Sequence, residues 1–138
     1  MVAVDELDEA LMRLLKEDAR ASFVELAKAM GTSEGTVRAR LKKLTDAGVI
    51  KQFTVRTAGK AVKALVSVMV NANVKMANVS QSISRMDGVS DVWEVSGDED
   101  ILVRVDVAST EELDEVVEKI RNLPEVKGTN SRLILREL

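Results

Sequence analysis

The sequence predicts an α+β protein in which an N-terminal winged helix-turn-helix precedes a ferredoxin-like domain with the element order βαββαβ. Two patterns predict this fold class. In residues 1–50, apolar side chains recur at helical spacing in three short segments. From residue 64 onward, stretches of two-residue alternation are interleaved with two stretches of helical spacing. We therefore expect domains at 1–56 and 64–138, joined by a small, basic linker at 57–63.

Two helices are predicted before residue 32. The first should span about 5–18 and bury four leucines, namely Leu7, Leu11, Leu14 and Leu15. Ser22 and Glu25 form a capping box that begins the second helix, because each side chain can satisfy a backbone N–H of the other. Gly31 should end this helix as its C-cap residue. Its predicted core residues are Val24, Leu26, Ala27 and Met30.

The third predicted helix, 33–46, has two unlike faces. One face is an apolar stripe made of Val37, Leu41 and Leu44. The other carries two small residues, Gly35 and Ala39, between cations, so that the helix axis can approach a grooved partner such as DNA closely. Gly48 should end the helix, and the alternation of Phe53 and Val55 with polar residues predicts a wing strand.

Positive charge is concentrated around this helix. Residues 33–63 carry eight Lys and Arg against two acids, a local charge of +6 in a chain whose net charge is -3. This distribution indicates contact with a phosphate backbone, although a basic, solvated surface helix is the alternative. We expect base-edge contacts from Ser33, Thr36 and Arg38, and phosphate contacts from Lys42, Lys43, Lys51, Lys60 and Lys63. Arg40 lies nearer the apolar stripe and is expected either to brace the fold or to reach the DNA backbone.

The second domain is predicted from alternation and caps. The expected strands are 64–74, 89–96, 100–107 and 128–136, with helices at 78–86 and from Ser109 to before Pro124. The first strand should bury Val66, Val68, Val70, Ala72 and Val74. Both helices cover one sheet face, yet the second face also carries large side chains, namely Leu65, Met69, Trp93, Val95 and Leu102. A second copy of the chain is therefore expected to cover that face, giving a symmetric dimer that recognises a roughly palindromic DNA site.

Composition excludes several kinds of chemistry. The chain has no Cys and no His, so a zinc site, a histidine base and a cysteine nucleophile are excluded. No metal, no cofactor and no catalytic residue is expected. The acidic start lacks a signal-peptide pattern and no apolar run reaches about 18 residues, so a cytoplasmic location is expected.

Motifs in both domains resemble those of the Lrp/AsnC, or feast/famine, family of transcription regulators. The shared motifs are the acids Asp5 and Asp8, EDAR at 17–20, ELA at 25–27, GTSEGTVRARLKKL at 31–44, GVI at 48–50, VSGDED at 95–100 and LPEV at 123–126. The ending KGTNSRLILR at 127–136 further resembles the archaeal, lysine-responsive branch of the family. Residues 51–65 depart from the family pattern, since they contain no Pro in the hinge segment.

The resemblance implies a transcription regulator that responds to an amino acid bound between dimers, which often assemble into octamers. The implied effector residues are Ser96, Gly97, Asp98, Glu99 and Asp100, with Thr129, Asn130 and Ser131 from the last strand of a neighbouring subunit. Three consecutive acids favour a lysine or arginine effector, because a carboxylate can bind its second cation. A solvated hairpin turn and a divalent cation site are the other interpretations of this loop.

Three other functions fit the sequence less well. An RNA-binding module shares the βαββαβ order, but it stacks bases on sheet aromatics and this domain has only Trp93. A stand-alone amino-acid sensor acting on a protein partner leaves the +6 segment unexplained. An enzyme is disfavoured because no catalytic constellation is present.

Overall fold

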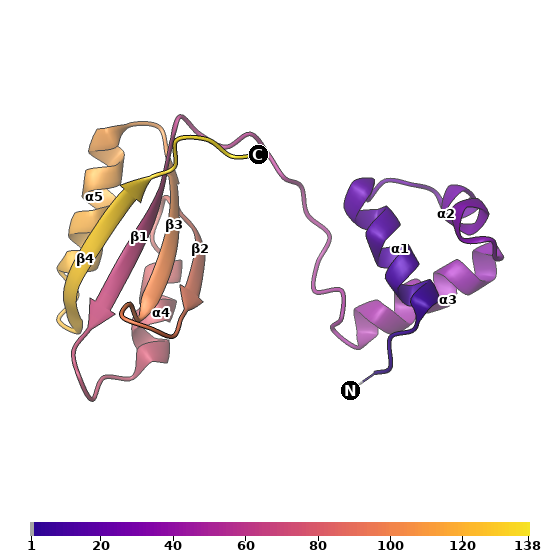
Figure 1. Ribbon diagram of the computed structural model, residues 1–138, viewed down its shortest axis with the longest axis horizontal. Helices are drawn as coiled ribbons and strands as arrows, with labels where there is room; N and C mark the ends of the chain where they lie inside the picture. The colour runs from indigo at the N-terminus through magenta and orange to yellow at the C-terminus, as the bar shows by residue number, and fades with distance from the viewer. Residues whose placement is uncertain (1) are drawn as a thin grey trace. The chain divides into compact units, whose positions relative to one another are not determined.

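The computed structural model describes residues 2–138, which form two compact units (Figure 1). The first unit extends to Arg56 and the second begins at Thr57. The first unit contains three helices and no strand, whereas the second is a sheet with two helices, as the sequence predicts for that domain. None of the helices in the described part of the chain is long and apolar enough to cross a membrane.

The first unit consists of three helices around a small core. Its elements are α1 (Glu6–Glu17), α2 (Phe23–Met30) and α3 (Glu34–Asp46). The buried core side chains are Leu11, Leu26, Ala27, Val37 and Leu44. The prediction that Val24 is buried was wrong, since 51% of its surface is exposed. Phe23 lies three residues before Leu26 and takes the core-facing position instead.

The caps of these helices follow the sequence. Ser22 accepts a hydrogen bond from the N–H of Glu25 while the Glu25 side chain accepts one from the N–H of Ser22, which completes the predicted capping box. Gly31 adopts a left-handed conformation with φ 67° and ends α2. Ser33 caps α3 by accepting a hydrogen bond from the N–H of Thr36. These local bonds fix where the turn between α2 and α3 begins and ends.

The predicted wing strand is the main difference in this unit. Residues 51–60 belong to no helix or strand, and Phe53 and Val55 are 54% and 80% exposed. A strand needs a neighbour that supplies backbone donors and acceptors, and the single chain offers none to this segment. The helix-turn-helix is confirmed, but its wing is not a strand in the isolated chain.

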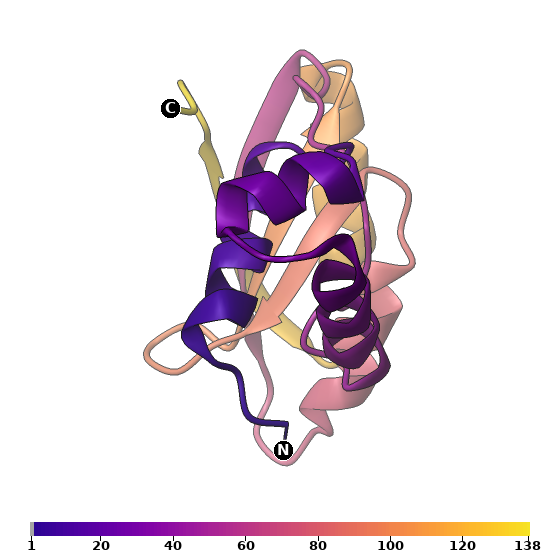
Figure 2. The same ribbon diagram turned by 90° about the vertical axis from the view of Figure 1, so that its right-hand side faces the viewer.

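The second unit is a four-stranded antiparallel sheet in the order β2-β3-β1-β4. Its elements are β1 (Val62–Val70), α4 (Met76–Ser84), β2 (Val89–Glu94), β3 (Ile101–Val107), α5 (Thr110–Arg121) and β4 (Val126–Leu133). Figures 1 and 2 show both helices on one side of the sheet. This is the predicted βαββαβ arrangement.

The core of this unit lies between the sheet and its helices. Ile101, Val103 and Val105 of β3 are fully buried there, together with Val66 and Val68 of β1. The predicted first strand was too long: β1 ends at Val70, so residues 72 and 74 are not part of it. A turn follows directly, in which Asn73 has φ 67°, a conformation incompatible with a continuing strand.

The opposite sheet face, which we call the open face, carries large side chains. Leu65, Met69 and Leu102 are half-buried there, whereas Trp93 is 45% exposed. Polar groups line its border, where Glu137 accepts hydrogen bonds from Lys63 and Arg104. No element of the second unit covers this face.

Candidate nucleic-acid interface and effector loop

The start of α3 holds two of the predicted base-reading residues. The hydroxyls of Ser33 and Thr36 lie 2.9 Å apart and share a hydrogen bond, and the Ser33 hydroxyl also accepts the N–H of Thr36 at 3.2 Å. The Ser33 oxygen is therefore committed to capping the helix. A base contact from Ser33 has to compete with that cap, whereas Thr36 keeps part of its hydrogen-bonding capacity.

Arg38 and Lys42 lie on the exposed face of α3, one turn apart. The guanidinium carbon of Arg38 lies 4.4 Å from the centroid of the Phe23 ring. Lys42 forms an exposed ion pair with Asp46 at 2.5 Å, which raises the pKa of Lys42. Gly35 and Ala39 separate the cations, as expected for a face that approaches a groove.

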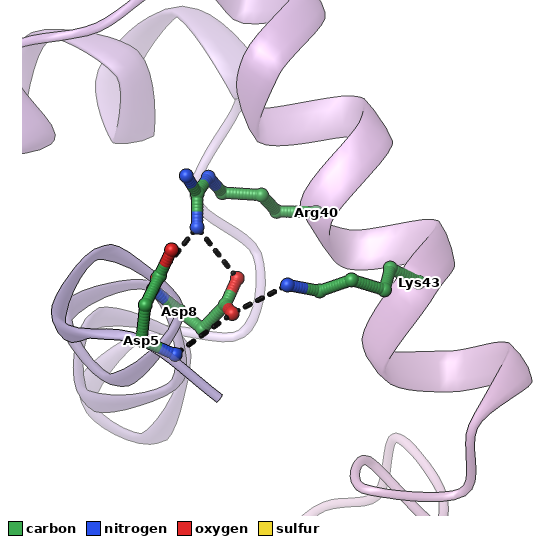
Figure 3. Close-up of polar contacts among 4 residues, drawn as sticks. All are labelled: Asp5, Asp8, Arg40 and Lys43. Carbon is green, nitrogen blue, oxygen red and sulfur yellow. Dashed lines mark hydrogen bonds and ion pairs between the residues drawn. The ribbon is translucent and has the colours of Figure 1, made fainter. Parts of the chain in front are cut away.

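Arg40 and Lys43 point the other way, toward the start of α1 (Figure 3). Nη1 of Arg40 lies 2.6 Å from Oδ1 of Asp5 and 3.0 Å from Oδ1 of Asp8. Nζ of Lys43 lies 2.5 Å from Oδ2 of Asp8, whose side chain is completely buried. Of the two roles expected for Arg40, the structure shows the bracing one. Lys43 is likewise held by the fold, so that its predicted phosphate contact competes with a buried carboxylate.

The acidic pair is strongly perturbed by these contacts. The hydrogen bond from Arg40 holds the pKa of Asp5 well below its ordinary value of 3.8. Burial by itself raises the pKa of Asp8, but hydrogen bonds from Lys43, the N–H of Asp5 and Arg40 outweigh it and lower the pKa overall. Both carboxylates therefore stay ionised at neutral pH and attract α3 to α1.

The remaining predicted DNA contacts lie after α3. Lys51 is exposed in the segment without secondary structure, and Lys60 belongs to the second unit, where its N–H donates to Asp106 at 2.7 Å. Lys63, expected in the linker, lies in β1 and donates to the carbonyl of Ala58 and to Glu137. Its ammonium is thereby used within the second unit.

The predicted effector loop connects β2 to β3. Ser96, Gly97 and Asp98 are exposed, and Gly97 has φ 114°, which favours glycine. Asp100 closes the loop against β1, since its carboxylate accepts the N–H of Val70 at 2.8 Å and its N–H donates to the carbonyl of Val68 at 3.1 Å. Asp100 is thus a structural residue of the loop.

Arg132 is a residue of this region that the sequence did not single out, and it forms an ion pair with Glu99. Its Nη2 donates to Glu99 at 2.8 Å and to the buried hydroxyl of Ser67 at 3.1 Å. The available signal was its spacing, because Arg132 lies two residues after Asn130 on the same face of β4. Of the three loop acids, only Asp98 has no hydrogen bond or ion pair within residues 2–138.

The predicted residues of β4 lie across β1 from this loop. Ile101, which follows the loop, and Thr129 both pair with Val68, on opposite sides of β1. They are therefore about 10 Å apart, two strand spacings. Thr129, Asn130 and Ser131 of the same chain are separated from the loop by a strand, so the structure does not bring the two halves of the predicted effector site into contact within one chain.

A helix-turn-helix with an outward basic face, joined to an antiparallel sheet domain, defines a DNA-binding regulator. Residues 4–45 match the AsnC-type helix-turn-helix domain, and residues 63–138 match the Lrp/AsnC ligand binding domain. The chain therefore belongs to the Lrp/AsnC family of transcription regulators, which confirms the resemblance stated above.

Related proteins and structures match this chain over nearly its whole length. The HTH-type transcriptional regulator LysM of Sulfurisphaera tokodaii is 35% identical over 137 residues, covering 99% of this chain and 98% of that protein. LysM of Saccharolobus solfataricus is 34% identical, over 96% and 94% of the two chains. A feast or famine regulatory protein of M. tuberculosis, solved with L-methionine, has a TM-score of 0.88 and 28% identity, covering 98% of this chain and 94% of that one. These relatives are named as regulators, which confirms that the chain is not an enzyme.

Substitution of Asp8 tests the bracing of α3. We expect Asp8→Asn to lower the free energy of unfolding at pH 7 by about 1–3 kcal/mol, because it removes a buried charge with two cationic partners. Asp46→Asn breaks only an exposed pair and should change it by less than about 0.5 kcal/mol. Urea denaturation followed by circular dichroism measures both.

The pH dependence of the free energy of unfolding gives a second test of the bracing role of Asp8. A lowered folded-state pKa contributes stability that is complete above the ordinary value of 3.8 and is lost as the pH falls through the depressed value. The difference between wild type and Asp8→Asn should therefore shrink below about pH 4. Equal losses for Asp8→Asn and Asp46→Asn at every pH would contradict the bracing role.

Proposed function

We propose that this regulator reads a specific DNA sequence with α3 and that an amino acid bound to its second unit changes that binding. The observation that carries the first half is the outward face of α3, where Gly35, Arg38, Ala39 and Lys42 follow one another at helical spacing. Small residues permit close approach to a major groove, and the cations between them meet bases and phosphates.

The structure divides the predicted DNA-contacting residues by their existing partners. We assign base contacts to Arg38 and Thr36, with a secondary contribution from Ser33. Lys42 and Lys51 are assigned to phosphates because both side chains are exposed. The other predicted contacts, Lys60 and Lys63 of the second unit, supply weaker phosphate attraction, and Arg40 and Lys43 mainly hold α3 in place.

The effector half of the proposal concerns the loop at 96–100. Gly97 lets the backbone approach a carboxylate and offer N–H groups to it, while Asp98 is available to an ammonium. Lysine or arginine remains the favoured effector, but its second cation needs a second acid. Asp100 is held by a backbone N–H of β1, so the second acid is Glu99, which has to exchange its ion pair with Arg132 for the ligand. The methionine complex of the M. tuberculosis relative supports an amino acid as the class of ligand.

Assembly is the proposed link between effector and DNA. The open face suits a second copy of the chain, so that a homodimer forms through the sheets. Thr129, Asn130 and Ser131 then contribute from a neighbouring subunit, in a higher assembly such as an octamer. An effector changes DNA binding only if it binds two assemblies, or two arrangements of one assembly, with different affinity.

Substitutions of Lys42 and Lys43 separate a phosphate contact from a role in holding α3 in place. We expect Lys42→Gln to reduce the slope of log K against log salt by about 0.9 for each bound protomer, since one phosphate contact is lost. Lys43→Gln should leave that slope unchanged and instead lower thermal stability. Fluorescence anisotropy with duplex DNA at several salt concentrations measures the slopes. Equal slope changes would place both lysines on the DNA.

Substitution of Asp98 tests the proposal that an amino acid binds this loop and changes DNA binding. DNA from upstream of the protein's own gene is titrated in the presence of each common amino acid, and one of them is expected to shift the wild-type affinity. Asp98→Asn should abolish this shift while leaving affinity without the effector within about twofold, because the loop lies outside the DNA-reading unit. The matched control is Asp114→Asn on the outer face of α5, which removes the same charge and should retain the shift.

The outcomes of that titration separate the two halves of the proposal. A retained response in Asp98→Asn would place the ligand elsewhere. A wild-type protein that responds to no amino acid would contradict the effector half alone. A ligand response without any preference over random DNA would instead favour the stand-alone sensor acting on a protein partner.

Substitution of Trp93 tests the proposed dimer interface on the open face. Trp93→Glu should shift the protein toward its monomer mass of 15.1 kDa in sedimentation experiments, because a charge would be buried without a partner between the two open faces. Val24→Glu is a matched control, since Val24 is 51% exposed, like Trp93 at 45%, but lies in the first unit. An unchanged mass for Trp93→Glu would show that the open face is not the interface.

A further inference from the structure

Phe23 occupies a fixed position at the entrance of the helix-turn-helix. It is the first residue of α2, directly after the N-cap Ser22, and the reciprocal bonds between Ser22 and Glu25 hold the backbone at this point. The Phe23 side chain packs against the buried cluster of the first unit. The side chain is only partly buried, so that part of the ring remains at the surface.

The guanidinium of Arg38 lies over the Phe23 ring. The distance of 4.4 Å from the guanidinium carbon to the ring centroid is within the range of about 6 Å for a cation–π interaction. Such a contact uses the ring face and leaves the N–H donors of the guanidinium edge available. Glu34, one turn earlier on α3, forms no ion pair with Arg38, and no hydrogen bond or ion pair of Arg38 occurs within residues 2–138.

Arg38 differs in this respect from the other predicted base readers. The hydroxyls of Ser33 and Thr36 are bonded to each other at the cap of α3. Arg38 therefore carries the largest set of unused donors on the outward face. A long side chain normally loses rotamer freedom when it binds, and a contact that already restricts it reduces this cost.

We propose that Phe23 is a positioning residue for DNA recognition, acting as a platform that holds Arg38 ready to read a base edge. The partner chemistry that fits is guanine in the major groove, whose O6 and N7 accept two parallel hydrogen bonds from an arginine. The inference rests on the proposed role of α3 as the sequence-reading element. It makes Phe23 a determinant of specificity, although its ring touches no base.

This role is separable from the contribution of Phe23 to the core. Leucine and methionine fill an apolar site of similar size but have no π face, whereas tyrosine keeps the ring. None of these substitutions changes the charge of the protein, so phosphate contacts and the salt slope should remain those of the wild type. A loss confined to sequence preference is the signature of the platform.

The test is a double-mutant cycle with the full-length protein. The wild type first selects a preferred duplex from a random pool, and specificity is the ratio of the Kd for a scrambled duplex to the Kd for the preferred one. Phe23→Leu is expected to reduce this ratio about two- to fivefold, the loss typical of one exposed cation–π contact. Phe23→Tyr should retain the ratio. In an Arg38→Ala background, Phe23→Leu should no longer change it.

Each other result overturns the inference. Equal effects of Phe23→Leu in both backgrounds would show a role in packing alone, as would parallel losses on preferred and scrambled duplexes. If thermal denaturation shows that Phe23→Leu does not fold, Phe23→Met takes its place in the cycle. A wild type with no preferred duplex would overturn sequence reading as well. A preference that Arg38→Ala leaves undiminished would keep sequence reading in place, through Thr36 and Ser33, and reject only the platform.

Discussion

The buried carboxylate of Asp8 is the constraint on which the DNA-reading unit depends. A charge without solvent contact is tolerated only with partners, and here Lys43 and Arg40 supply them from a helix that is more than thirty residues away in the chain. This requirement fixes the rotation of α3 about its own axis. Two of its cations must point toward α1, and Arg38 and Lys42 are consequently turned outward.

Local signals predicted most of the fold, and pairing over longer distances explains what they missed. The caps at Ser22 and Gly31 need only neighbouring backbone atoms, so that the sequence located α2 closely. The alternating segment at β3 forms the predicted strand because both of its neighbours lie in the same chain. Residues 53 and 55 alternate as well, but no strand is available to pair with them. Alternation indicates a capacity to form a strand, and a partner decides whether it does.

The sequence indicates where the candidate DNA-binding surface lies, but not which of its cations are available to DNA and which are bound within the protein. Counting charge singled out the basic segment, but a count does not distinguish Lys42, which is 76% exposed, from Lys43, which binds a buried acid. The decisive residue, Asp8, belongs to an acidic helix start whose sequence pattern is that of an ordinary capping box. Only the packing of α1 against α3 shows that its carboxylate also organises the recognition helix.

The predicted effector loop likewise contains acids that are bonded within the fold and one acid that is not. Asp100 is bound to the backbone of β1, and Glu99 reaches Arg132 and through it Ser67, so that two acids anchor the loop to two strands of the sheet. The third acid, Asp98, precedes these two anchored acids and has no such bond itself, so in the proposed function it is the acid available to a cation. Because the anchors lie on the strands that form the open face, a ligand that alters the loop acts on a segment bonded directly to the proposed subunit interface. Under the proposed function, this continuity is the physical connection between a bound effector and assembly.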